Sequence, residues 1–351
     1  MELKNIDKIL IIKLRAVGDV IMSTVVFDNL RNAFPKARID FLTESESKDL
    51  LIGNPVLNQV HVYDRKHLLT NSFLIRSKEN RNIIKKIRNQ KYQLVFDFFG
   101  NPRSAWLTWL SGAKYRVGYD YRIRRFAYNI TVASRADRVH EVDWHLDALD
   151  ILGIPIISKS LNVYIGTGSR NFAESFWHES GLDKQTVFAI NFSGGWSSKQ
   201  WPLERFAHLI DQLSLKYKCK FLILWGPGEK EQAEEIGHLA TTPVNLIPET
   251  NLTQLAAILE KVDLMITTDS GPMHVAAAVA IPCVTLFGPT DPALQGPYGT
   301  NHEIIKNDSK ECPGCKQKKD DAYHTCMKAI TVKDVLACVD RAIIKNDIRV
   351  G

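Results

Sequence analysis

The sequence predicts an α/β protein made of two Rossmann-like domains with parallel sheets, and three observations support this class. Its 351 residues suit two domains of about 150 to 200 residues each. Short apolar segments alternate with segments of helical periodicity, which is typical of parallel strands covered on both faces. The alternation starts again after about residue 160, so we expect the two domains to join near residues 158–171.

The first half contains four predicted strands, each a short apolar run, at residues 8–13, 38–43, 59–63 and 93–97. Helical spacing predicts helices at residues 20–33, 80–89 and 141–152. The last of these helices stops at Gly153, with Pro155 beyond it, which is a common end signal.

The second half repeats the pattern, with predicted strands at residues 187–191, 221–225, 263–267 and 283–287. The helices predicted between and after them lie at residues 203–217, 230–239, 252–260 and 272–280. We therefore expect domains at residues 1–165 and 166–330, followed by a C-terminal helical segment at 331–351.

The composition is that of a soluble globular protein, with 45% hydrophobic and 24% charged residues. It excludes collagen-like, coiled-coil and disordered chains. The longest weakly polar stretch, at residues 275–287, is interrupted by Pro282 and is too short to span a membrane. The start of the sequence does not resemble a signal peptide, so we expect a cytoplasmic protein.

The net charge of +6 is unevenly distributed along the chain. Residues 1–165 carry +9 and the remainder −3, and residues 65–125 alone carry +12. Such an asymmetry indicates either an anionic partner for the first half or a solvated basic face.

The turn after the first predicted strand is the first candidate site, because ligands of open α/β sheets bind beyond strand ends. Gly18 is the only glycine there, so the three-glycine fingerprint for NAD or FAD is absent. Asp19 follows at the mouth of a helix. It either caps that helix or removes a proton from an incoming hydroxyl at the edge of a cleft between the domains.

Residues 191–202 form the second candidate, with Ser193, Gly194 and Gly195 after a strand and Lys199 before a helix. Small residues followed by a lysine suit phosphate oxygens, although this is not a Walker sequence. The alternative is a surface loop with a solvated lysine.

The strongest local signal is the turn and helix at residues 267–278. The Ser270–Gly271 turn exposes backbone N–H groups, and Pro272 suits the first helical turn, as at a diphosphate site on a helix N-terminus. His274 can donate to a phosphate or a sugar, or be a hydrogen-bonded core histidine. Asp269 either caps the helix or accepts from a sugar hydroxyl.

A third strand–turn–helix junction lies at residues 225–231. Either Glu229 or Glu231 could accept hydrogen bonds from a ribose diol, since a carboxylate is a natural acceptor for two neighbouring hydroxyls. Both are equally ordinary as acids at a helix N-terminus.

Taken together, these segments resemble glycosyltransferase family 9, the ADP-heptose:lipopolysaccharide heptosyltransferases. The resemblance covers nearly the whole chain and rests on residues 13–20 (KLRAVGDV), 199–202 (KQWP), 269–274 (DSGPMH) and 287–292 (FGPTDP). It implies the GT-B fold, in which two Rossmann-like domains with parallel sheets face each other across a deep cleft. In that fold the last helix, here residues 332–344, packs back on the first domain.

The resemblance also implies roles for individual residues. Asp19 matches the family's proposed catalytic base, and Lys199 matches its diphosphate-binding lysine. The implied donor-binding residues are Ser193, Gly194, Gly195, Lys199, Glu229, Thr250, Asp269, Ser270, Gly271 and His274. The acceptor-binding residues expected in the basic first domain are Arg15, Gly18, Arg103, Arg116 and Arg124.

The implied reaction is an inverting transfer of heptose from ADP-heptose to a hydroxyl of the lipopolysaccharide inner core. Lys199 and the N–H groups around Ser270–Gly271 would stabilise the departing ADP. No Asp-x-Asp sequence occurs in the chain, so there is no obvious Mg²⁺ site, which favours a metal-independent reaction. We expect no other cofactor. We expect an anionic inner-membrane surface in a Gram-negative cell as a further partner, and no nucleic acid.

Four of the six cysteines gather near the C-terminus. Cys312, Cys315 and Cys326, with His324, could hold a structural zinc ion, although their spacing is not that of a clean zinc motif. A redox-sensitive pair and reduced structural thiols are the alternatives.

Three alternative functions are also compatible with some of these sequence features. One is a GT-B transferase or epimerase that uses another nucleotide sugar, or a transferase that acts on a protein. Another is a non-catalytic nucleotide-sugar-binding relative, which the joint presence of Asp19, Lys199 and His274 disfavours. The third, a nicotinamide oxidoreductase, is disfavoured by the missing glycine fingerprint.

Overall fold

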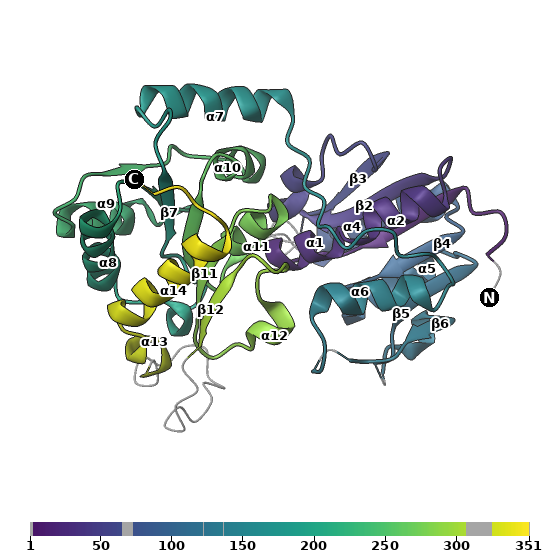
Figure 1. The fold of residues 1–351 in the computed structure, drawn as a ribbon. Helices are drawn as coiled ribbons and strands as arrows, with labels where there is room; N and C mark the ends of the chain where they lie inside the picture. Colours follow the sequence, from purple (N-terminus) through teal and green to yellow (C-terminus); the bar gives the residue numbers. More distant parts are fainter. Residues whose placement is uncertain (1–2, 65–72, 122, 136, 307–324, 351) are drawn as a thin grey trace. The chain divides into compact units, whose positions relative to one another are not determined.

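The computed structural model describes residues 3–64, 73–121, 123–135, 137–306 and 325–350. The chain forms two compact units, Met1–Tyr164 and Ile165–Gly351, and the division falls one residue before the expected boundary. Each unit has one six-stranded parallel sheet with helices packed on it (Figure 1). The predicted α/β class with two parallel sheets is therefore confirmed.

The sheet of the first unit has the strand order β3-β2-β1-β4-β5-β6. Its strands are β1 (Lys8–Ile12), β2 (Arg38–Glu44), β3 (Gln59–Tyr63), β4 (Leu94–Asp97), β5 (Tyr115–Tyr119) and β6 (Ile130–Val132). The central strand β1 pairs in parallel with β2 on one side and β4 on the other. It is almost completely buried, as expected for a strand covered on both faces.

Two groups of helices cover this sheet. Leu10 and Ile12 of β1 pack in one cluster with Ile87 of α4 (Phe73–Gln90) and Leu107 of α5 (Pro102–Leu110). Because side chains alternate along a strand, Ile9 and Ile11 face the opposite side. A second group, α1 (Val17–Ser23), α2 (Val26–Ala33) and α6 (Glu141–Asp150), packs together.

The single helix predicted over residues 20–33 is two helices in the structure, α1 and α2. Thr24 lies at the break, and its hydroxyl donates to the Ile21 carbonyl oxygen at 2.6 Å. Threonine hydrogen bonds of this kind compete with the helical pattern, which explains why the apolar periodicity continued across the break while the helix did not. Short 3-10 helices, η1 (Ser45–Leu50) and η2 (Arg125–Ala127), complete the unit.

The second unit repeats the winding of the first, with the strand order β12-β11-β10-β7-β8-β9. Its strands are β7 (Val187–Asn191), β8 (Lys220–Leu224), β9 (Val244–Leu246), β10 (Leu264–Thr268), β11 (Cys283–Phe287) and β12 (Glu303–Lys306). Counted from the start of each unit, both sheets have the order 3-2-1-4-5-6 of the dinucleotide-binding fold.

Helices pack on this second sheet in two groups as well. Of these, α8 (Leu203–Lys216) packs against α9 (Lys230–Leu239), and α10 (Leu252–Leu259) packs against α7 (Thr167–Glu179) and α11 (Gly271–Ala278). The remaining short elements are η3 (Ser197–Lys199), α12 (Pro292–Gln295) and α13 (Thr325–Ala329).

The C-terminal helix α14 (Val332–Lys345) packs on the second unit, where its partners include α8, β11 and β12. The packing of this helix on the first domain, which the family resemblance implies, stays a prediction. Val335, Val339 and Ala342 recur at helical spacing and lie in the same buried cluster as Phe206 of α8. This apolar stripe therefore completes the core of the second unit.

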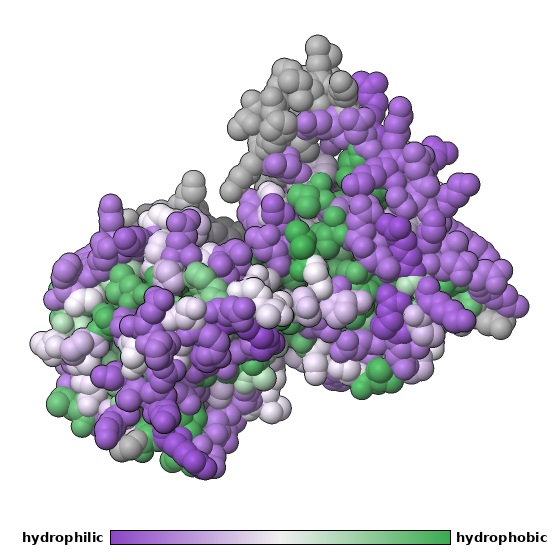
Figure 2. Space-filling model, turned by 90° about the horizontal axis from the view of Figure 1, so that it is seen from above, coloured by the Kyte–Doolittle hydropathy of each residue, from purple (hydrophilic) through white to green (hydrophobic). Residues whose placement is uncertain are grey.

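Polar side chains cover most of the face seen in Figure 2, and apolar ones form smaller groups among them. Within the residues that the structure describes, no helix combines the length and the apolar character needed to cross a membrane.

Candidate active site

Both sheets have a point at which the strand order reverses, and ligands of open α/β sheets bind beyond the strand ends at such a point. In the first unit it lies between β1 and β4, and in the second between β7 and β10. Polar side chains of the predicted site gather at both points.

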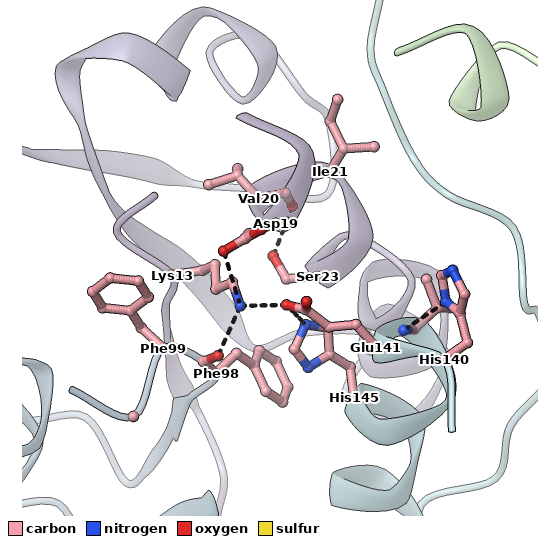
Figure 3. Close-up of polar contacts among 12 residues, drawn as sticks. Lys13, Asp19, Val20, Ile21, Ser23, Phe98, Phe99, His140, Glu141 and His145 are labelled. Carbon is pink, nitrogen blue, oxygen red and sulfur yellow. Dashed lines mark hydrogen bonds and ion pairs between the residues drawn. The ribbon is translucent and has the colours of Figure 1, made fainter. Parts of the chain in front are cut away.

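Lys13, which follows β1, lies buried at the first of these points (Figure 3). Its Nζ donates to the carbonyl oxygen of Phe98, beyond the end of β4, at 3.0 Å. It also donates to Oε1 of Glu141 at 2.6 Å and lies 3.8 Å from Oδ2 of Asp19. Lys13 thus joins the ends of two central strands and faces two carboxylates, of which Glu141 is the nearer.

Asp19 stands in the first turn of α1 with its side chain 31% exposed. A hydrogen bond with the backbone of Ala16, the N-cap of α1, gives it the capping role considered above. Burial raises the pKa of Asp19 to about 6, while Lys13 opposes that rise. The carboxylate is therefore ionised at neutral pH, accessible, and more basic than an ordinary aspartate, which suits a general base.

Glu141 and His145 of α6 form the far side of this centre. Burial would raise the pKa of Glu141, but Lys13 and His145 hold it well below its usual range. Burial lowers the pKa of His145 to about 4, so its ring is neutral at pH 7. Its Nε2 lies 3.5 Å from Oε1 of Glu141, and its Nδ1 is hydrogen-bonded to the hydroxyl of Tyr119. Glu141 is thereby held as the charged partner of Lys13.

The five predicted acceptor-binding residues differ in what they contact. Arg15 is exposed beside Asp19, and Gly18 is buried in the same turn of α1. Arg103 stands at the start of α5. Its Nη1 lies 3.6 Å from Oε1 of Glu44, and its guanidinium lies over the ring of Tyr63.

The other two predicted arginines lie near η2. Arg116 donates from Nε and Nη1 to the carbonyl oxygens of Ala127 and Ala113, at 2.9 and 2.7 Å. Its guanidinium therefore holds backbone together. Arg124 lies half-buried over the ring of Tyr121, 4.3 Å from its centroid.

In the second unit, Lys199 and Asp269 meet at the point between β7 and β10. Lys199 Nζ lies 2.5 Å from Asp269 Oδ2, and the hydroxyl of Thr290 donates to the same oxygen at 2.5 Å. The ammonium of Lys199 also lies 4.9 Å from the ring centroid of Trp196. A cation held this way is a fixed point charge for an anionic ligand.

Only glycine fits at position 194, because the backbone of Lys199 passes close to its Cα. A Cβ at this position would lie 2.9 Å from the backbone carbon of Lys199. Gly195 has a positive φ of 27°. These two glycines shape the loop that carries Lys199.

Glu229 connects two of the strand-end loops. Its Oε1 accepts from the Ser193 hydroxyl at 2.7 Å, and its Oε2 accepts from the Gly226 N–H at 2.8 Å. Glu229 and Ser193, both predicted donor-binding residues, are therefore brought together. The predicted residue Thr250 lies half-buried in the loop before α10.

The first turn of α11 stands at the same point of the second sheet. Asn191, at the end of β7, donates to the hydroxyl oxygens of Thr267 and Ser270, each at 2.8 Å. In the described part of the chain no side chain caps α11 at Ser270, so the N–H of Gly271 points out of the helix start. His274 is buried, with 5% of its surface exposed, in the first turns of this helix.

The possible zinc ligands Cys312, Cys315 and His324 lie outside the described residues. Cys326 is buried in the core of the second unit. Among the residues described, no three histidine, cysteine or acidic side chains are grouped as metal ligands.

Residues 80–325, about two thirds of the chain, match the sequence profile of glycosyltransferase family 9 (heptosyltransferase). The chain belongs to glycosyltransferase family 9. It is 26% identical over 343 residues to lipopolysaccharide heptosyltransferase 3 of Escherichia coli, covering 94% of this chain and 97% of that one. Membership of family 9 makes it a transferase, as predicted.

Solved structures of family 9 proteins share the fold. A glycosyl transferase family 9 protein of Veillonella parvula superposes with a TM-score of 0.81 at 25% identity, over 97% of both chains. A heptosyltransferase of Escherichia coli with ADP-2-deoxy-2-fluoro heptose gives 0.72 at 21% identity, over 95% of this chain and 99% of that one. The GT-B class predicted for this glycosyltransferase is thus confirmed.

Sequence reasoning did not single out Glu141, His145 or Thr290 of this family 9 protein. Glu141 and His145 are four residues apart, so they share the buried face of a helix that was predicted. Two titratable residues on an otherwise apolar face are a signal that could have identified them. Thr290 lies in the segment 287–292 that carries the family resemblance, but nothing in the sequence there indicated a contact with Asp269.

Proposed function

We propose that this glycosyltransferase moves heptose from ADP-heptose to a hydroxyl of the lipopolysaccharide inner core, on Kdo or on another heptose. Family membership and the names of its relatives support the reaction, because the Escherichia coli relative is a lipopolysaccharide heptosyltransferase. We infer ADP-heptose as the donor because a similar Escherichia coli heptosyltransferase was solved with ADP-2-deoxy-2-fluoro heptose.

The observation that carries the proposal is the state of Asp19. In a single displacement, the acceptor hydroxyl loses a proton as it attacks the anomeric carbon, and the configuration there inverts. Asp19 is half-buried, its pKa is raised to about 6, and Lys13 is drawn toward Glu141 instead of neutralising it. It can therefore accept that proton at neutral pH.

The leaving group is the β-phosphate oxygen of ADP, on which negative charge grows. Lys199 supplies a cation for it, and the N-terminus of α11 supplies the N–H of Gly271 and a positive helix dipole. Glu229, near the same strand ends, would accept hydrogen bonds from the ribose. These groups account for leaving-group stabilisation by the chain itself, so we propose a reaction without metal.

The basic first unit would bind the anionic acceptor. Residues 1–165 carry a net charge of +9, and inner-core lipopolysaccharide carries carboxylates and phosphates. Arg15, beside Asp19, and Arg103, at the start of α5, are the proposed anchors. Such an acceptor would keep the enzyme at the cytoplasmic face of the inner membrane in a Gram-negative cell.

The test compares Asp19→Asn with the wild type in transfer from ADP-heptose to truncated lipopolysaccharide cores, followed by mass spectrometry. We expect kcat to fall about 10²- to 10⁴-fold, because general base catalysis contributes this much. The Kd for ADP should stay the same, and thermal shifts should favour ADP over UDP and GDP. Asp7→Asn, an exposed carboxylate of the same unit, is the control that should change nothing.

A kcat for Asp19→Asn near that of the wild type would leave Asp19 with its capping role alone. A lower kcat in Asp19→Asn would not be explained by unfolding of the variant. Burial disfavours the charged form of Asp19, so a neutral asparagine should not lower the free energy of unfolding at neutral pH.

A further inference from the structure

An aromatic patch lies exposed on the first unit. It consists of Trp106 and Trp109 on α5, Phe126 on η2 and Ile123 just before η2, with exposed fractions of 52, 46, 48 and 87%. The ring of Phe126 lies 5.1 Å from that of Trp106 and 6.4 Å from that of Trp109, and the two indoles are 5.5 Å apart. Large contiguous apolar groups on a surface are uncommon and mark an interaction site.

The aromatic patch stands on a well-supported base. The opposite face of α5 is buried through Ala105 and Leu107, and Ala105 packs with Ala127 and Tyr128 beneath the patch. The hydroxyl of Tyr128 donates to Asp97 at the end of β4 at 2.8 Å. The rings are therefore presented outward by buried packing on their own unit, which leaves them available to a partner.

The surroundings of the patch are strongly basic. Residues 98–134 contain six lysines and arginines and one acidic residue, Asp120. That residue lies 3.8 Å from Arg125, which is next to Phe126. Arg103 stands one turn before Trp106 on α5, but its guanidinium lies beside Glu44 and the ring of Tyr63. Lys114 is also exposed, just beyond the end of α5.

We propose that the aromatic patch docks on an anionic lipid bilayer. Tryptophan is favoured at the boundary between lipid and water because its ring is apolar while its N–H can remain hydrated. Arginine and lysine beside it would meet the phosphates of the headgroups. A protein partner with an acidic rim, or a second copy of the chain, would bind the same rings, but the basic surroundings would repel a second copy. The choice of a membrane rests on the proposed function, whose acceptor is a lipid-linked glycan.

The patch has a direct connection to the candidate base. It stands on α5, the helix that follows β4, and the carbonyl oxygen of Phe98 at the end of β4 accepts from Lys13 beside Asp19. Docking through the patch would hold the unit that carries Asp19 against the surface from which the acceptor sugars project.

The test is flotation of the full-length protein with vesicles of phosphatidylethanolamine and phosphatidylglycerol, and with vesicles of phosphatidylcholine alone. We expect binding to the anionic vesicles, weakened but not abolished by high salt, because rings and charges both contribute. The double variant Trp106→Ser/Trp109→Ser should bind about tenfold more weakly. Ile123→Glu, at a position too exposed to affect folding, should also weaken binding.

Two controls separate this proposal from others. Leu215→Ser/Ile344→Ser removes two side chains, each 82% exposed, from the second unit and should leave vesicle binding unchanged. Transfer to a soluble, lipid-free core should be equal in wild type and patch variants. Absence of that transfer in the wild type, with vesicle binding retained, would contradict the proposed function only.

The docking proposal is overturned if the wild type does not bind anionic vesicles, or if the patch variants bind them as tightly as the wild type does. It is also overturned if those variants instead convert a dimer into a monomer in sedimentation, because the patch would then be an interface between two copies.

Discussion

Each unit of this glycosyltransferase places a lysine opposite an aspartate beyond its central strands, but the two pairs differ. In the second unit Lys199 Nζ lies 2.5 Å from Oδ2 of Asp269, so the aspartate holds the ammonium group directly in place. In the first unit Lys13 lies 3.8 Å from Asp19, because a second carboxylate, Glu141, is closer to it at 2.6 Å. The same two residue types therefore give a held cation in one unit and a basic carboxylate in the other.

This difference shows how burial and a third side chain together change the chemistry of an ion pair. Lys13 pairs more closely with Glu141 than with Asp19, so burial raises the pKa of Asp19 to about 6 although Lys13 opposes that rise. Asp269 has no such competitor among the contacts of Lys199 that the structure records, and it is further held by Thr290. We infer that Asp19 is free to react, whereas Asp269 positions Lys199.

The largest expected effect is on the stability of the first centre. Lys13→Met leaves Glu141 buried without its cation, and breaking a buried pair from one side costs about 3 to 5 kcal/mol. Urea unfolding measures this loss. The double variant Lys13→Met/Glu141→Gln should recover most of it, since neither charge then remains. Equal losses in the single and double variants would contradict the pairing described here.

The next effect is on nucleotide binding at the second centre. Lys199→Met should raise the Kd for ADP about 10- to 100-fold, because a hydrogen bond to a charged group contributes about 1.5 to 3 kcal/mol. Calorimetric titration measures it. Lys216→Met is the matched control, since Lys216 also lies 2.5 Å from an aspartate but is half exposed, on α8. If both variants bind ADP like the wild type, Lys199 is a structural lysine.

The sequence predicted the central strands and the helices beside them, because buried parallel strands are continuous apolar runs. It did not indicate the edge strands β6, β9 and β12, whose residues are mostly half-buried or exposed and therefore lack a strong pattern. It also missed the interior strand β5, whose sequence YRVGY is not a continuous apolar run. It also missed α5, whose outward face carries Trp106 and Trp109 and so disguises its amphipathic period. Helix α7 was missed because Ala173 and Trp177 are its only fully buried residues.

The candidate site was predictable where a residue comes directly after a strand, as Asp269 does, or stands in the first turn of the helix that follows it, as Asp19 does. The partner that sets the behaviour of Asp19 could not be predicted in this way. Glu141 is 128 positions from Lys13, and their pairing depends on how α6 packs against the sheet. The packing of α14 on the second unit could not be predicted for a related reason, since its apolar stripe gives no indication of which unit it contacts.

The central claim is that Asp19 is a base whose pKa is raised by burial and kept high by Glu141. Its most direct test is the pH dependence of kcat/KM. A base must be unprotonated, so the wild type should lose activity as the pH falls through about 6. In Glu141→Gln, a negative charge is removed and Lys13 is released toward Asp19, and both changes lower the pKa of Asp19. The midpoint should therefore move to lower pH. A midpoint unchanged in this variant, or a wild-type profile that is flat between about pH 5 and 8, would contradict the claim.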